Sequence, residues 1–379
     1  MAGYLITLND EKSLAEIVNY GIYSTIMSSP KHSSWGISHE GTFADYLSMK
    51  SGDLIFFFVK RKIYGCGKLE NVGDDCKYLN YISAGEPNGD WSNDYSKTRL
   101  LSFGNNQNRC FCTFVPYPAF FKKGIDMDAI LQNNKDPFRS IRTLWKLSFI
   151  KLDDDESKAL FSVLVKNNEN VLNNLEEQYL FDSSFHSQLR RVSLYKYKMH
   201  RQFLISNCKD KSNNHLKHEM ALEASLCEIL STENRKPFGK WDYISHQVAA
   251  SPFKPIDYMD KMDIFGYRYI AGYDIKSKYM IAELKKGEAT VEIVEQIMKY
   301  VDWVSNEYAN KDYSMIEAYI IASSFGDKVI DLVKKHCVRN FTKGYRPAEF
   351  CEWNDVKMVR YKVLEDDIVF SLVEPKNLE

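Results

Sequence analysis

Residues 262–304 constrain the fold more than any other part of this chain, because two strand patterns are joined there by a turn and followed by a helix pattern. The apolar run at residues 279–285 predicts a strand, in which side chains two positions apart point the same way. Glu283 and Lys285 therefore share one face of that strand, and Asp263 lies in the strand pattern before the turn. The sequence thus predicts a sheet that brings two carboxylates and an amine together.

These residue types suit the hydrolysis of a phosphodiester. Asp263 and Glu283 offer the hard oxygen ligands that Mg²⁺ or Mn²⁺ prefers, so we expect them to be metal ligands. Lys285 would orient the attacking water and offset the negative charge that develops on the phosphate. The alternative is ordinary surface chemistry, since a lone Glu-x-Lys is usually a solvated strand face and a lone Asp often belongs to a turn.

The order of these residues resembles the PD-(D/E)xK nuclease superfamily, in which an acidic residue, a hairpin and Glu-x-Lys follow one another. Gln296 and Tyr300 resemble the Gln-x-x-x-Tyr addition of the RecB-type and NucS-type branches, and their spacing makes them neighbours on a helix. The resemblance implies that both residues belong to the catalytic site. The expected apolar face of this helix consists of Val291, Val294, Met298 and Val301.

An upstream helix pattern at residues 223–230 is similar to the first helix of such nucleases. The resemblance implies that Glu223 supports the metal site, and Glu219, one turn earlier, is the alternative. It covers roughly residues 213–325 and implies a C-terminal nuclease domain over residues 213–379.

The N-terminal part, residues 1–165, alternates short apolar strand patterns with loops rich in Asn, Gly and Asp, which predicts a barrel-like α+β domain. A helix is expected at residues 11–20, capped by Asp10 or Asn9, and a tight hairpin at residues 60–62. Strands are expected at residues 4–8, 53–59, 63–69 and 110–115.

Residues 14–25, 52–58 and 64–69 resemble the YTH and EVE branches of the PUA-like superfamily. The resemblance implies a pocket that binds a flipped base, with Tyr23 at the position of the family's first cage tryptophan. Further aromatic residues in or near loops could complete such a cage, and the alternative is that all of them are core residues. They are Trp35, Phe43 and Trp91.

Residues 166–212 predict a packed helical connector. Its second half opens the most basic stretch of the chain, residues 186–218, which includes Arg190, Arg191 and Lys196. These side chains could neutralise the phosphates of a nucleic acid, although a solvated face is an equally good interpretation.

Composition narrows the remaining classes of function. The net charge of −1 gives no general attraction to nucleic acid, so any such surface must be local. The eight cysteines form no Cys-x-x-Cys pair, which argues against a zinc ribbon or a disulfide framework. The longest purely apolar run, residues 54–59, is too short to cross a bilayer. We therefore expect a soluble cytoplasmic protein that makes no membrane contact.

Together these features predict an α+β and α/β protein with a PUA-like β-barrel domain, a helical connector and a PD-(D/E)xK domain. The expected function is a Mg²⁺-dependent endonuclease acting on DNA, with RNA as a possible substrate. The resemblance suggests bacterial or archaeal defence, as in restriction or Shedu-like anti-phage nucleases. A homo-oligomer is expected, because one such site cuts one strand. The alternatives are a structure-specific DNA repair endonuclease and a non-catalytic nucleic-acid-binding protein with a nuclease-like scaffold.

Overall fold

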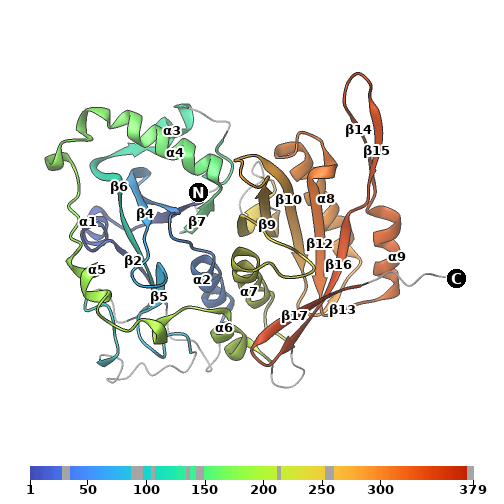
Figure 1. Cartoon of the computed structure of the whole chain (residues 1–379), viewed down its shortest axis with the longest axis horizontal. Helices are drawn as coiled ribbons and strands as arrows, with labels where there is room; N and C mark the ends of the chain where they lie inside the picture. The colour runs from blue at the N-terminus through green and yellow to red at the C-terminus, as the bar shows by residue number, and fades with distance from the viewer. Residues whose placement is uncertain are drawn as a thin grey trace. The chain divides into compact units, whose positions relative to one another are not determined.

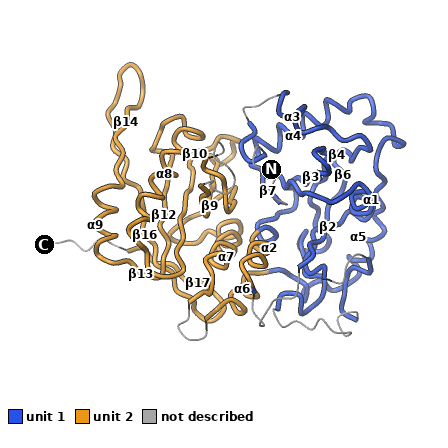
Figure 2. The backbone as a smooth tube through the Cα atoms, turned by 180° about the vertical axis from the view of Figure 1, so that it is seen from behind, with its two compact units in different colours: residues 1–35, 45–199 blue, residues 36–44, 200–379 orange. Residues whose placement is uncertain are grey.

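The chain forms two compact units, each with its own mixture of helices and strands (Figures 1 and 2). The first unit contains residues 1–35 and 45–199, and the second contains residues 36–44 and 200–379. These boundaries differ from the expected ones, because residues 166–199 pack with the first unit and residues 36–44 with the second. The computed structural model describes residues 1–27, 35–86, 97–103, 107–133, 137–141, 149–210, 215–251 and 260–373.

The first unit is built on a mixed sheet in the order β2-β6-β4-β3-β1-β7, with β5 also paired to β6. Strand β3 reads Leu-Ile-Phe-Phe-Phe-Val and is buried along its whole length, as expected for a central strand covered on both faces. Within the described residues no pairing joins β2 to β7. The described strands therefore form an open path from β2 to β7, and the predicted PUA-like barrel is not confirmed. The strands are β1 (Gly3–Thr7), β2 (Ile22–Ile26), β3 (Leu54–Val59), β4 (Lys62–Leu69), β5 (Lys77–Leu79), β6 (Asn108–Asp126) and β7 (Phe149–Leu152).

Two local features of this unit were predicted from the sequence, a helix cap and a tight hairpin. Helix α1 (Glu11–Tyr20) begins after Asp10, whose carboxylate accepts the backbone N–H of Ser13 at 2.7 Å, so the predicted cap is confirmed. The predicted hairpin between β3 and β4 is also confirmed, since Lys60 and Arg61 both adopt a positive φ, at 46° and 69°. The longer helices that follow are α3 (Met127–Asn133) and α4 (Asp154–Asn167).

The expected connector is helical only in short pieces. After α4 the chain forms single turns, because Asn168 and Asn174 sit at the turn boundaries and Asn174 caps the next one through its side chain. The pieces are η4 (Glu169–Val171), η5 (Leu175–Glu177), α5 (Ser184–Leu189), η6 (Tyr195–Tyr197) and α6 (Arg201–Cys208).

The second unit contains a six-stranded sheet in the order β17-β16-β12-β10-β9-β8. Strand β10 (Lys276–Leu284) lies between β9 (Lys261–Tyr269), its antiparallel hairpin partner, and β12 (Ile316–Ala322), which runs parallel to it. The predicted hairpin is therefore confirmed. Helix α7 (Glu219–Thr232) packs against β8, β9 and β10, and helix α8 (Glu292–Glu307) against β10 and β12. The other sheet strands are β8 (Tyr243–Ala249), β16 (Val356–Leu364) and β17 (Asp367–Leu372).

The predicted apolar face of α8 is buried at three of its four residues, because Val294, Met298 and Val301 are at most 5% exposed. Ile293, Ile297 and Val304 are almost completely buried, whereas Val291, which was expected on the apolar face, is 40% exposed. The buried face of α8 is therefore wider than predicted and also includes Ile293, Ile297 and Val304. The remaining elements of this unit are β11 (Glu288–Ala289), η8 (Tyr313–Met315), β13 (Ser324–Phe325), α9 (Asp327–His336), β14 (Arg339–Lys343) and β15 (Glu349–Trp353).

Residues 36–44, which belong to the second unit, form most of helix α2 (Ile37–Leu47). Glu40 of this segment is fully buried, and its Oε1 lies 2.7 Å from Nδ1 of His218, the residue that precedes α7. A segment from the N-terminal part of the sequence thus completes the packing around the start of α7. Among the described residues, no helix is long and apolar enough to span a bilayer.

Candidate active site

The site forms where β9 and β10 lie side by side, at the end of β10. Glu283 is the penultimate residue of β10 and is 1% exposed. The carboxylate of Asp263, on β9, accepts the backbone N–H of Leu284 at 2.8 Å through Oδ2. This hydrogen bond holds Asp263 beside the segment from Glu283 to Lys285, so the three residues expected from sequence lie together.

Burial makes the two carboxylates costly to ionise. The pKa of Glu283 is raised far above its usual range, first because the side chain is buried and then because Asp263 adds negative charge nearby. The pKa of Asp263 is also raised, by burial and by the charge of Glu223. Oε2 of Glu283 is buried and has no hydrogen-bond partner among the described residues. The negative charge of the Asp263 and Glu283 carboxylates is therefore incompletely compensated by the described residues.

Lys285 supplies part of the compensating positive charge. Its Nζ lies 3.9 Å from Oε1 of Glu283 and 3.3 Å from Oε1 of Glu219, on the first turn of α7. The other oxygen of Glu219 accepts the backbone N–H of Lys286 at 3.0 Å, which fixes this carboxylate at the end of β10. Glu219 thus contacts Lys285, whereas Glu223 contacts other side chains of the site.

Glu223 lies one turn further along α7 and faces Asp263. Its two carboxylate oxygens accept hydrogen bonds from the side-chain amide of Gln247, at 2.9 and 3.0 Å. The same amide nitrogen lies 3.3 Å from Oδ1 of Asp263. Gln247 therefore bridges the two acidic residues, although no sequence motif identifies it as a site residue.

Gln296 and Tyr300 lie on α8 and are joined to each other. The amide of Gln296 donates to the hydroxyl oxygen of Tyr300 at 3.1 Å, as their spacing of four residues allows. Burial raises the pKa of Tyr300, and the negative charges of Glu283 and Asp263 raise it further. The pKa of Tyr300 therefore depends on the charge of both buried carboxylates.

A divalent cation fits this group of side chains. Asp263 and Glu283 provide hard oxygen donors, and a cation would satisfy the buried Glu283 oxygen that has no hydrogen-bond partner. It would also relieve the repulsion that raises both pKa values. The donor set therefore matches Mg²⁺ or Mn²⁺ rather than a thiol-seeking metal.

A second acidic cluster lies in the first unit and was not predicted from the sequence. Ligand oxygens of Asp153, Asp154 and Asp155 lie within 4.8 Å of one another at the start of α4. Asp153 accepts the backbone N–H of Glu156 at 2.9 Å and lies 3.8 Å from Arg139. These contacts are those of an acidic helix N-terminus, where carboxylates are favoured by the helix dipole.

The expected aromatic cage residues are placed less favourably. Tyr23 lies on β2 and is partly buried, with its ring 6.1 Å from that of Phe57. Trp35 is 2% exposed and lies under the guanidinium of Arg109, and Phe43 is fully buried. Neither ring is presented to solvent, because other side chains already cover it. Trp91 lies outside the described residues.

The expected phosphate-binding residues remain at the surface of the first unit. Arg190, Arg191 and Lys196 are all exposed. Arg190 is partly neutralised, since its Nη2 lies 3.5 Å from Oε1 of Glu70. Lys198, two residues after Lys196, likewise pairs with Asp74 at 2.9 Å. Part of the basic stretch is thus balanced by acidic neighbours.

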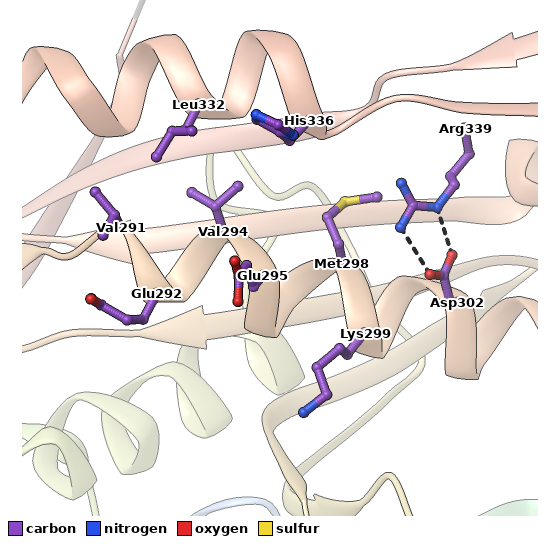
Figure 3. Close-up of a pocket in the computed structure, with 10 residues that line it drawn as sticks. All are labelled: Val291, Glu292, Val294, Glu295, Met298, Lys299, Asp302, Leu332, His336 and Arg339. Carbon is purple, nitrogen blue, oxygen red and sulfur yellow. Dashed lines mark hydrogen bonds and ion pairs between the residues drawn. The ribbon is translucent and has the colours of Figure 1, made fainter.

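A pocket of about 500 Å³ lies on the other side of α8, between that helix and α9 (Figure 3). Val291, Val294 and Met298 contribute its apolar surface. Arg339 and Asp302 form a paired hydrogen bond at one end of it, at 2.8 Å for both contacts. None of the proposed catalytic side chains lines this pocket.

No family model matches the chain, and no curated protein matches it. The structures to which it is similar include a repair endonuclease from Pyrococcus abyssi, at 23% identity over 26% of this chain and 34% of that one, with a TM-score of 0.18. A complex of EndoMS with double-stranded DNA is 20% identical over 34% of this chain and 45% of that one, with a TM-score of 0.21. A hypothetical protein from Leishmania major is 10% identical over 45% of this chain and 96% of that one, with a TM-score of 0.27. Because these TM-scores are low, the assignment of function rests on the side chains of the site.

Proposed function

We propose that the second unit is a metal-dependent endonuclease that hydrolyses phosphodiester bonds of DNA, with Mg²⁺ or Mn²⁺ held by Asp263 and Glu283. The observation that carries this proposal is the buried Glu283 carboxylate, which has one oxygen without a hydrogen-bond partner and lies next to Asp263 and Lys285. Burying carboxylates lowers the stability of a fold. Buried carboxylates with raised pKa values beside a lysine are therefore expected mainly at catalytic sites.

Each residue has a distinct role in this proposal. When bound, the cation would supply positive charge at the scissile phosphate and polarise the attacking water. Lys285, 3.9 Å from Glu283, would orient that water and stabilise the additional negative charge of the transition state. Glu219 fixes the lysine ammonium, and the Gln296–Tyr300 pair would position the Tyr300 hydroxyl toward the phosphate or the metal ligands.

The proposal is tested with purified protein, supercoiled plasmid and Mg²⁺ or Mn²⁺. Asp263→Asn, Glu283→Ala and Lys285→Ala are each expected to abolish nicking while the thermal unfolding transition is retained. Lys278→Ala is the matched control, because Lys278 lies on the same strand but donates to the backbone oxygen of Ser314 outside the site. Undiminished nicking by folded Glu283→Ala protein would contradict the assignment.

The biological setting belongs to the same proposal. We infer a defence nuclease whose first unit senses a nucleic-acid feature, with Tyr23 as the residue that a base would contact and Arg190, Arg191 and Lys196 as phosphate contacts. Mismatched or branched substrates cut in preference to linear duplex would instead indicate structure-specific repair. Binding of DNA without any metal-dependent cleavage would indicate a non-catalytic protein. A panel of modified, unmodified, branched and single-stranded substrates separates these outcomes.

A further inference from the structure

Gln247 has an unusual backbone for a strand residue. It lies in β8, and its φ of +52° is in the left-handed region that a residue other than glycine rarely adopts. The ladder between β8 and β9 pairs His246 with Ile264 and Val248 with Met262 in unchanged register, so Gln247 lies opposite Asp263. A strained residue of this kind persists only where its surroundings hold it, and such residues gather at functional sites.

The Gln247 side chain points toward the acidic residues. Its amide nitrogen lies 2.9 and 3.0 Å from the two oxygens of Glu223 and 3.3 Å from Oδ1 of Asp263. An amide nitrogen donates hydrogen bonds, so it compensates both carboxylates without adding a full charge. Nδ1 of His246 lies 3.5 Å from Glu223 on the same side.

Glu223 and Glu283, on either side of Asp263, therefore differ in how fully their oxygens are hydrogen-bonded. Glu223 is 3% exposed and both of its oxygens accept from Gln247, whereas the Oε2 atom of Glu283 has no hydrogen-bond partner among the described residues. Asp263 lies between them and contacts the Gln247 amide on one side only. A cation would satisfy Oε2 of Glu283, whereas the Gln247 amide already lies within hydrogen-bond distance of both Asp263 and Glu223.

We propose that Gln247 limits this site to one divalent cation, because its amide occupies the place that a second cation would take between Asp263 and Glu223. Two-metal nucleases use a pair of ions about 3.5–4 Å apart, bridged by a shared carboxylate, and Asp263 is the residue here that could be shared. The inference rests on the proposed function, since it assumes that Asp263 and Glu283 bind a cation. It assigns to Gln247 a positioning role, holding Glu223 and Asp263 apart from a second ion.

Counting bound Mn²⁺ by electron paramagnetic resonance of the free ion tests this without any measurement of cleavage. The whole wild-type chain is expected to bind one Mn²⁺, and Glu283→Ala to bind none. Gln247→Gly keeps a residue suited to the left-handed backbone and removes the amide, so it is expected to gain a second, weaker ion. Gln247→Glu is expected to gain a tighter one, which Glu223→Gln in the same chain removes. Thr232→Glu, which adds one charge at the exposed end of α7, serves as the control and stays at one ion.

The outcomes separate this inference from the proposed function. If wild-type protein binds two ions and Glu223→Gln removes one of them, the inference is wrong and the nuclease assignment stands. If folded Gln247→Gly still binds one ion, the amide is not what excludes the second, and the inference is again overturned. If wild-type protein binds no ion that Glu283→Ala removes, the metal site itself fails.

Discussion

Burial of Glu283 lowers the stability of the folded protein. The residue is 1% exposed, lies next to Asp263, and has an oxygen without a hydrogen-bond partner among the described residues. Replacing it with the neutral Glu283→Gln removes the charge and keeps the shape. We expect the metal-free variant to unfold at a higher temperature than the wild type, by about 2–4 °C for each kcal/mol gained. Differential scanning calorimetry in EDTA measures this, and an unchanged or lower melting temperature would show that the carboxylate is stabilised in some other way.

The same residue predicts how stability depends on pH. The pKa of Glu283 is higher in the folded protein than the value of about 4.3 expected when unfolded, so the folded state binds more protons between the two. Stability of the metal-free protein should therefore fall as pH rises above about 4.3, until the folded pKa is passed. Glu283→Gln should lose part of this slope. Melting temperatures of both proteins between about pH 5 and pH 8 compare them, and parallel curves would rule out Glu283 as the source.

Tyr23 offers a test of the first unit. If the ring only packs against its neighbours, such as Phe57, Tyr23→Ala should cost up to about 3 kcal/mol of stability and leave nucleic-acid affinity of the folded protein unchanged. If it contacts a base, affinity or substrate choice should change while cation binding at Asp263 and Glu283 does not. We expect the second result, and measuring melting temperature and DNA binding on the same variant distinguishes the two.

At this scale the sequence was informative where the chemistry follows strand periodicity. Asp263, Glu283 and Lys285 could be predicted because alternate residues of a strand share a face, and Gln296 and Tyr300 because they are one helical turn apart. Gln247 could not, since its position depends on a left-handed backbone conformation that strand periodicity does not reveal. The burial of Trp35 beneath Arg109 was equally out of reach, because it depends on a contact between distant parts of the chain.

Among the elements, the β14–β15 hairpin pairs with no other described strand and carries two exposed aromatic residues, Tyr345 and Phe350. A two-stranded hairpin has little stability of its own, so its base must be anchored. Asp302 of α8 provides an anchor by accepting two hydrogen bonds from Arg339 and one from the Tyr313 hydroxyl.

We expect Asp302→Ala to loosen this hairpin while the sheet remains intact. The pair is partly exposed, so the loss of global stability should stay below about 1 kcal/mol. Hydrogen–deuterium exchange should nevertheless accelerate in residues 339–353. Asp331→Ala on α9, which changes an exposed aspartate, is the control and should leave the hairpin unaffected. Equal exchange in both variants would mean that the hairpin is held by other contacts.

Elements with strong local signals were predicted best. Helix α1 has a capping aspartate at its start and a glycine with a φ of +62° at its end, and β3 and β4 are joined at two left-handed residues. The short turns of residues 166–200 were not foreseen, because leucines at helical spacing favour a helix whereas the interrupting asparagines end it. Tertiary packing then decides between these tendencies.

For the molecule as a whole, we expect a homo-oligomer. One site cuts one strand, and paired sites in a symmetric assembly are the simplest route to a double-strand break. Light scattering coupled to size-exclusion chromatography should give at least twice the chain mass of 44.1 kDa at micromolar concentration. A monomeric mass both with and without DNA would contradict this expectation, and the protein would then be expected to nick rather than break duplex DNA.

The contribution of residues 36–44 to the second unit has a consequence for how the protein is made. A ribosome releases this segment long before it synthesises α7 and the strands that carry Asp263 and Glu283. The buried contact between Glu40 and His218 can therefore form only late, once both ends of a long stretch of chain are available. A chain that stops before α7 lacks Asp263 and Glu283, and an internal start that yields only residues 200–379 lacks the segment that packs at α7. Neither product would contain both halves of this contact, so the second unit is complete only in a chain that carries residues 36–44 together with residues 200–379.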